Sequence, residues 1–196
     1  TIFPSHFLLN FYSKKCFSQS DVIIPIMDWE LWQAKRRNRK YISLLNPVPE
    51  KGVDIFIKLV EFLPDYDFLT QDVWYKSFIP RHKYPNLKII SRNYSNIKNN
   101  MGLKFFLENT RILLCPSKWE DASPTIVTQC MKNGIPVIGS NKGGIPELLR
   151  GAGIIVFQYQ NIEEWVSAIK LMNNKKTYNE ISIQSQNQAT RFSYEK

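Results

Sequence analysis

From residue 40 onward, short apolar runs alternate with segments whose apolar residues recur at helical spacing. This alternation is typical of a parallel sheet covered by helices, because a crossover, usually a helix, must carry the chain back between parallel strands. The runs predicted as strands span residues 41–45, 67–70, 87–91, 112–115, 136–139 and 154–157. The sequence therefore predicts an α/β fold, a Rossmann-like parallel sheet flanked by helices.

Two segments between these runs have the spacing of a helix with one buried face. The apolar residues that recur at i, i+3, i+4 and i+7 are Phe56, Leu59, Val60 and Leu63 in the first segment and Ile162, Trp165, Val166 and Ile169 in the second. We interpret both stripes as core. Two helix starts are also predicted: Asn161 with Glu164 fits a capping box, and Ser123 before Pro124 fits an N-cap with proline at the first helical position.

The regular pattern begins near residue 40. Residues 1–39 contain a predicted helix at 6–12, an apolar strand at 22–26 and a basic linker, and we expect this segment to be an entry crossover. Residues 40–196 are long enough for one well-packed domain. After residue 173 the chain becomes polar, and a final helix is predicted through Ile181 and Ile183.

The composition excludes several classes of protein. Hydrophobic residues make up 43% of the chain, yet no apolar run approaches the roughly 20 residues of a membrane-spanning helix. No signal peptide is readable, and the absence of an initial Met fits a fragment of a longer protein. Three cysteines (Cys16, Cys115 and Cys130) without CxxC spacing indicate neither a disulfide framework nor a zinc site. We therefore expect a cytoplasmic protein.

The net charge of +9 would attract a phosphate-bearing ligand, a nucleic acid or an anionic membrane, and charge alone does not choose among them. Much of this charge lies in two clusters, at residues 35–40 and 81–83. A solvated face is the simplest interpretation of both clusters. The first also fits peripheral contact with an anionic membrane surface.

Ligands of open α/β sheets bind beyond the carboxyl ends of the strands, where helix N-termini direct their N–H groups outward. The corresponding loops are residues 46–52, 92–97, 116–123 and 140–144. In the first loop, Lys51 lies in the opening turn of a helix, where a cation opposes the helix dipole and an anion would relieve the conflict. Gly52 would let a ligand approach the backbone. An ordinary exposed lysine is the alternative.

Two further loops offer groups that bind anions. Ser123, Thr125 and Ile126 open a helix with a hydroxyl and backbone N–H groups, although the same residues would serve as an ordinary cap. Gly143 and Gly144 would bring backbone close to phosphates, but paired glycines are common in loops. The convergence of three loops at one sheet edge is what predicts a pyrophosphate site.

The segment from Leu114 to Leu149, LCPSKWEDASPTIVTQCMKNGIPVIGSNKGGIPELL, closely resembles the donor-binding signature of the retaining family 4 glycosyltransferases. Residues 47–54, PVPEKGVD, resemble that family's phosphate-lysine segment, and residues 151–156, GAGIIV, resemble its following strand. The likeness runs from Tyr41 to Met172, and the order and spacing of the motifs make it specific. It implies the C-terminal half of a GT-B fold, with residues 1–39 as the crossover from a first domain.

The resemblance also implies roles for site residues. Lys51 would hold the donor diphosphate, together with backbone N–H groups at Thr125 and Ile126. The base of the nucleotide would be recognised by the loop after the third predicted strand. The alternative for Arg92 in this loop is an ordinary surface charge. The candidates in this loop are Arg92, Asn93 and Ile97.

Three positions depart from the family pattern. Members carry two glutamates eight positions apart, where this chain has Asp121 and Gln129. Asp121 can still accept sugar hydroxyls, and Gln129 can pair with ribose hydroxyls through its amide. Asn46 stands where many members have an arginine that faces the diphosphate. Because charged hydrogen bonds are roughly twice as strong as neutral ones, these changes predict weaker donor binding rather than none.

The activity implied is transfer of a sugar, with retention, from a nucleoside diphosphate to an acceptor hydroxyl, with Lys51 and Asp121 as catalytic candidates. No divalent metal is expected, because Lys51 and the helix N–H groups would stabilise the leaving diphosphate. A glycan or lipid acceptor would bind through another domain or subunit, and no nucleic acid partner is expected. Three hypotheses remain open: the donor domain of a larger enzyme, a subunit of a split glycosyltransferase, and a non-catalytic nucleotide-binding or partner-binding module.

Two features are interpreted as structural. Residues 65–67, DYD, imitate the DxD metal motif of the other large glycosyltransferase fold, but they precede a predicted strand at the opposite sheet edge. We interpret them as a turn. His6 and His82 have no partner at the spacing of a catalytic base or a metal ligand, so we expect them to be structural or exposed.

Overall fold

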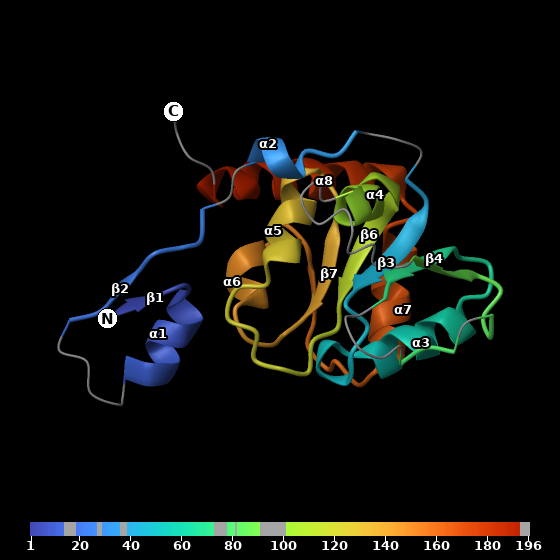
Figure 1. The fold of residues 1–196 in the computed structure, drawn as a ribbon, viewed down its shortest axis with the longest axis horizontal. Coiled ribbons are helices and arrows are strands. Elements are labelled where there is room, and N and C mark those ends of the chain that lie inside the picture. Colours follow the sequence, from blue (N-terminus) through green and yellow to red (C-terminus); the bar gives the residue numbers. More distant parts are fainter. Residues whose placement is uncertain are drawn as a thin grey trace.

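The computed structural model describes residues 1–13, 19–26, 29–35, 39–72, 78–80, 82–90 and 101–192. Six strands form one sheet in the order β5-β4-β3-β6-β7-β8 (Figure 1), and every neighbouring pair is parallel. Their bounds are β3 Tyr41–Leu45, β4 Phe68–Gln71, β5 Leu87–Ile90, β6 Thr110–Cys115, β7 Val137–Ser140 and β8 Ile154–Val156. Each lies at a run predicted as a strand, so the predicted parallel sheet is confirmed.

Helices cover both faces of this sheet (Figure 1). On one face lie α3 Val53–Phe62 and α7 Ile162–Leu171. On the other face lie α4 Met101–Asn109, α5 Thr125–Lys132, α6 Ile145–Leu149, α8 Lys175–Ala189 and the short helix η4 Thr190–Phe192. None of the helices in the described ranges combines the length and apolar character that a membrane crossing requires.

The predicted apolar stripes face the sheet. The three stripe residues within α3 and Leu63, which caps its end, are buried. In α7, Trp165 and Ile169 are fully buried while Ile162 and Val166 are half-buried. The indole of Trp165 keeps a hydrogen-bond partner, because Nε1–H donates to the backbone oxygen of Tyr159 at 2.9 Å. Burial of these apolar side chains is the main source of stability for the pairing of helix and sheet.

The first residues form a separate element beside this sheet. Strand β1 Ile2–Phe3 pairs in parallel with β2 Asp21–Val22, and α1 His6–Tyr12 lies between them in the chain, followed by α2 Trp29–Trp32. The helix has its predicted bounds. The strand predicted at 22–26 is wrong, because β1 offers only two residues for pairing and the last hydrogen bond of the ladder reaches Ile23. Residues 23–26 then continue without a partner strand.

Two helix starts differ from their predicted form. Helix α5 begins at Thr125 with Pro124 as its N-cap, so the chain stays extended one residue longer than predicted and Ser123 is not the cap. Asn161 does cap α7, accepting the N–H of Glu163 at 3.1 Å. The Glu164 carboxylate accepts the N–H of Gln158 at 3.2 Å, so the reciprocal half of the predicted capping box is absent in this described helix.

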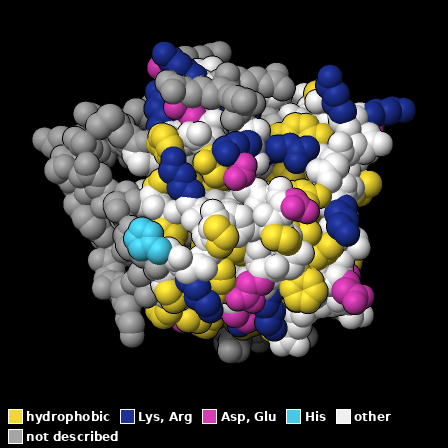
Figure 2. Space-filling view, turned by 90° about the vertical axis from the view of Figure 1, so that its right-hand side faces the viewer, with side chains coloured by type: hydrophobic (Ala, Val, Ile, Leu, Met, Phe, Trp, Pro, Cys, Tyr) yellow, Lys and Arg dark blue, Asp and Glu magenta, His cyan; other side chains and the backbone are white. Residues whose placement is uncertain are grey.

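Charged side chains are spread over the surface. On the face shown in Figure 2, Lys and Arg are interspersed with Asp and Glu rather than gathered by sign. Part of the cluster at 35–40 is structural: Arg39 donates to the backbone oxygen of Asn133 at 2.7 Å, and Lys40 lies 2.9 Å from the Asp67 carboxylate. Residues 36–38 and 81 of the basic clusters lie outside the described residues.

A contact between His6 and Glu147 joins α1 to the main domain. The backbone N–H groups of His6 and Phe7 donate to the two Glu147 oxygens at 3.0 and 2.9 Å, and the His6 ring Nδ1 lies 2.8 Å from Oε1. The expectation that His6 is structural or exposed is confirmed, because its side chain is 53% exposed and contacts Glu147. Its partner lies 141 residues away, beyond any local spacing.

Acid should weaken this junction. Burial raises the pKa of Glu147, but hydrogen bonds from His6 and Phe7 outweigh burial and hold the pKa below its ordinary value of 4.5. The contact therefore stabilises the folded state above pH 4.5 and is lost as the pH falls through the depressed pKa. Glu147→Gln should cost about 1 kcal/mol at neutral pH, and the difference in unfolding free energy from wild type should shrink in acid. A difference that stays constant with pH would contradict this role.

Candidate functional site

Loops from three neighbouring strands meet at the carboxyl edge of the sheet. The turn after β3 includes the short helix η2 Pro49–Lys51, residues 116–124 follow β6, and residues 141–144 follow β7. The loops after β3 and β6, with the ends of these two strands and the start of α5, enclose a pocket of about 250 Å³. Its lining residues are Leu44, Leu45, Asn46, Lys51, Leu113, Leu114, Cys115, Asp121, Ser123, Pro124, Thr125 and Ile126.

Six of the thirteen predicted site residues line this pocket. The pocket is lined by Asn46, Lys51, Asp121, Ser123, Thr125 and Ile126. Gly52 follows Lys51 directly, and Gln129 is buried one turn further along α5. Gly143 and Gly144 touch the segment around Asp121 rather than the pocket itself. Arg92, Asn93 and Ile97 lie outside the described residues.

An ion pair crosses the pocket. Lys51 Nζ donates to Asp121 Oδ2, and the two side chains are 33% and 21% exposed. Lys51 lies in the turn that opens α3, where a cation is unfavourable beside the positive end of the helix dipole. The expected anion is thus present within the chain itself, as the carboxylate of Asp121.

Gly52 is required by contact between two loops. Its φ is +77°, and a Cβ would lie 2.0 Å from the backbone oxygen of Pro116. The same loops are joined by the N–H groups of Lys118 and Trp119, which donate to the backbone oxygen of Glu50 at 2.9 and 3.3 Å. The space that was expected to admit a ligand beside Gly52 is therefore filled by Pro116.

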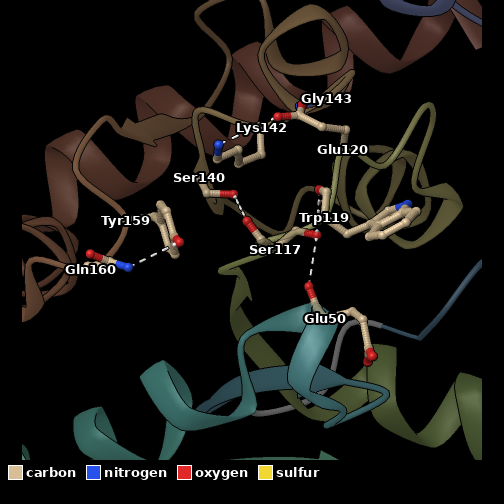
Figure 3. A network of polar contacts seen from close by, with 9 residues as sticks. All are labelled: Glu50, Ser117, Trp119, Glu120, Ser140, Lys142, Gly143, Tyr159 and Gln160. Carbon is tan, nitrogen blue, oxygen red and sulfur yellow. Dashed lines mark hydrogen bonds and ion pairs between the residues drawn. The ribbon is translucent and has the colours of Figure 1, made fainter.

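The paired glycines hold the loop that carries Asp121. A Cβ at Gly144 would lie 2.0 Å from the Ala122 oxygen, and the Gly144 N–H donates to the Asp121 oxygen at 2.7 Å. The Gly143 N–H donates to the Glu120 carboxylate at 2.6 Å (Figure 3). Contacts thus join Lys51 to Asp121 and Asp121 to Gly144, as the prediction of three converging loops requires.

Several contributors were not anticipated. Glu120 also lies 3.5 Å from Lys142 Nζ, and it had no distinguishing sequence signal. The Ser140 hydroxyl donates to the Ser117 backbone oxygen at 2.7 Å, which ties the ends of β6 and β7 together (Figure 3). Both serines are fully buried. For Ser140, the one signal in the sequence was its position at the end of an apolar strand.

The backbone explains the residue at position 46. Asn46 has a φ of +56°, directly after β3. Asparagine tolerates this left-handed conformation better than most residues that are not glycine, because its short polar side chain bonds locally. The turn therefore suits asparagine at position 46.

Cys115 forms part of the pocket wall but is not suited to nucleophilic chemistry. Burial raises the pKa of its thiol to about 12, and the nearby charge of Lys51 only partly offsets that effect. A nucleophile must be a thiolate, which this site disfavours at neutral pH. Cys115 and Cys130 are both free and buried, and Cys16 lies outside the described residues.

Metal ligands do not gather in the described structure. Within the part of the chain that is described, no three His, Cys, Asp or Glu residues form a candidate metal site. Residues 65 and 66 lie in the turn before β4, and Asp67 pairs with Lys40. The interpretation of residues 65–67 as a turn that leads into a strand is confirmed, with the strand beginning one residue later, at Phe68.

Residues 91–188, which are 98 of the 196 residues, match the model of the family described as glycosyl transferases group 1. The chain belongs to this family. No curated protein matches it significantly by sequence. The matched segment includes Gly143, Gly144 and the whole of α5, but it does not reach Lys51.

Solved structures share the fold of this group 1 chain. Sucrose-phosphate synthase from Thermosynechococcus elongatus is 14% identical, with a TM-score of 0.77 over 97% of this chain and 53% of that one. A glycosyltransferase from Rickettsia africae is 14% identical, with a TM-score of 0.76 over 98% and 59%. HepE from Anabaena, in complex with UDP, is 15% identical, with a TM-score of 0.76 over 98% and 59%.

These likenesses confirm the predicted fold class, the Rossmann-like C-terminal domain of GT-B glycosyltransferases. The chain spans between about half and three fifths of the length of the three structures described above.

Proposed function

We propose that this chain is the donor-binding domain of a retaining family 4 glycosyltransferase of the hexosyltransferase type. It would move a sugar from a nucleoside diphosphate to an acceptor hydroxyl. The observation that carries the proposal is the shared pocket of Lys51, Asp121 and Thr125, at the carboxyl ends of adjacent strands β3 and β6. In this pocket the cation and the helix start would bind the diphosphate, and the carboxylate would bind the sugar.

Each group has a part in this mechanism. Lys51 and the first N–H groups of α5, at Thr125 and Ile126, stabilise the charge that develops on the leaving diphosphate. Asp121 accepts sugar hydroxyls, and Gln129 accepts or donates to the ribose. The cation and the helix end take the place that a divalent metal fills elsewhere, so no metal is required. The base is recognised by the loop that contains Arg92, Asn93 and Ile97.

The complexes of related folds favour a nucleotide sugar as the ligand. The Anabaena HepE structures hold UDP, and UDP with glucose. Because this chain spans only part of such proteins, we assign acceptor binding, to a glycan or a lipid, to another domain or subunit. Residues 1–39 would be the crossover to it and residues 40–196 the donor domain. A cytoplasmic location, peripheral at an anionic membrane, agrees with this assignment.

A thermal-shift panel of nucleoside diphosphates tests the proposal. Uridine or guanosine diphosphate at 100 times its Kd should add about 2.7 kcal/mol to the unfolding free energy, which corresponds to roughly 5–10 °C in Tm. Uridine and guanosine without phosphates should give little shift. If no nucleoside diphosphate or nucleotide sugar stabilises the chain, the non-catalytic module becomes the better assignment.

A further inference from the structure

Two adjacent carboxylates pair with cations at this sheet edge. Asp121 holds Lys51, which the proposed function assigns to the diphosphate, and Glu120 holds donors of the neighbouring loop after β7, which does not line the pocket. Asp121 pairs with Lys51, and Glu120 accepts the Gly143 N–H at 2.6 Å while lying 3.5 Å from Lys142 Nζ (Figure 3). Each carboxylate thus contacts an ammonium group, and the second also contacts a backbone N–H.

Hydrogen bonds hold the backbone that carries both carboxylates. The Gly144 N–H donates to the backbone oxygen of Asp121 at 2.7 Å, and the N–H groups of Lys118 and Trp119 attach the preceding residues to the backbone oxygen of Glu50. Buried Ser117 hydrogen-bonds the Trp119 oxygen at 3.1 Å (Figure 3). Because these contacts hold the loop backbone, we expect an entering anion to displace the Asp121 side chain rather than the loop.

Carboxylates and phosphates bind the same donors. Ammonium groups and backbone N–H groups form charge-assisted hydrogen bonds with either anion. An anion that enters the pocket must therefore take Lys51 from Asp121. A diphosphate brings more charge than a single carboxylate, and its two phosphoryl groups can engage Lys51 and the first N–H groups of α5 at once, whereas a single phosphate can engage only one of these donor sets.

We propose that Asp121 acts as an internal counter-ligand that determines which anions the site accepts, and that the neighbouring Glu120 adds a weaker repulsion from outside the pocket. Asp121 is displaced by a diphosphate and largely retained against a single phosphate. The displaced Asp121 carboxylate then becomes available to the sugar hydroxyls. This inference rests on the proposed function, because it concerns the selectivity of the same site.

Titration calorimetry with inorganic pyrophosphate and with inorganic phosphate, at fixed pH and ionic strength, tests this selectivity. Asp121→Asn should bind pyrophosphate about tenfold more tightly than wild type and should lose part of its preference over phosphate, since the freed Lys51 no longer has a competitor. Glu120→Gln should act in the same direction by about two- to threefold, because its side chain is 49% exposed.

Asp54→Asn is the matched control. Asp54 pairs with Lys118 at 2.7 Å and does not line the pocket, so its removal deletes one negative charge nearby without freeing Lys51. It should change pyrophosphate affinity less than twofold. Melting curves establish that each variant is folded, and Glu120→Gln, on a half-exposed side chain, repeats the test independently of Asp121.

The outcomes separate the two proposals. Pyrophosphate binding that is tightened by Asp121→Asn and not by Asp54→Asn supports the inference, even if wild type binds too weakly to measure. If wild type binds pyrophosphate through Lys51 but Asp121→Asn and Glu120→Gln bind no more tightly than Asp54→Asn, the inference is overturned and the donor site stands. If no variant binds pyrophosphate, both proposals are overturned.

Discussion

Lys51→Ala should lower the affinity for a nucleoside diphosphate on the order of 100-fold. Lys51 is the cation in the 250 Å³ pocket, and its loss removes the charge-assisted hydrogen bonds to the phosphates. It also leaves Asp121 in the pocket without its ammonium partner, so the remaining carboxylate repels the ligand. Both effects act in the same direction, which is why a single truncation has so large an effect.

Titration of wild type, Lys51→Ala and Lys118→Ala with uridine or guanosine diphosphate measures this loss. Lys118 belongs to the same group of loops but pairs with Asp54 and does not line this pocket. Its removal should change affinity less than twofold, because exposed charges are screened. If wild type and Lys51→Ala bind the nucleotide with equal affinity, Lys51 does not contact the diphosphate.

Gly144→Ala should destabilise the domain by about 2–4 kcal/mol, or lower Tm by roughly 4–16 °C. The new Cβ would lie 2.0 Å from the Ala122 backbone oxygen, and no side-chain rotation can relieve a clash with backbone. The loops after β6 and β7 would have to separate, which also weakens the hydrogen bond from the Gly144 N–H to Asp121. Ligand affinity should fall together with stability.

Gly151→Ala provides the comparison. Gly151 has a φ of +84°, but a Cβ there meets no atom within 4 Å. Substitution should therefore cost only the backbone strain, about 1–2 kcal/mol. Thermal denaturation of both variants separates steric clash from conformational preference. Equal destabilisation would show that the contact with Ala122 is not what requires glycine at position 144.

The sequence was most informative where strands are buried on both faces. Strands such as β3, β6 and β7 appear as continuous apolar runs because helices cover both sides of the sheet. The run at 22–26 looks the same but has only the two residues of β1 to pair with. An apolar run reveals a tendency to pair and not the length of its partner.

For the site, sequence reasoning located the loops but not all the contacts within them. The loops converge as predicted because carboxyl ends of parallel strands share one edge. The pairing of Lys51 with Asp121 joins residues 70 positions apart, and the glycines at 52 and 144 serve backbone packing that no local pattern encodes. Glu120 had no feature to distinguish it from a solvated glutamate.

The adjacency of β3 and β6 has a consequence for how the pocket comes into being. Residues at and after the end of β3 form one wall of the pocket, and residues at and after the end of β6 form the other. Neither segment forms this pocket alone. The capacity to hold a ligand emerges only when this central, sequence-distant pairing closes, an event that topology makes slow. A chain with a ligand in this pocket must therefore already have its central strands β3 and β6 paired.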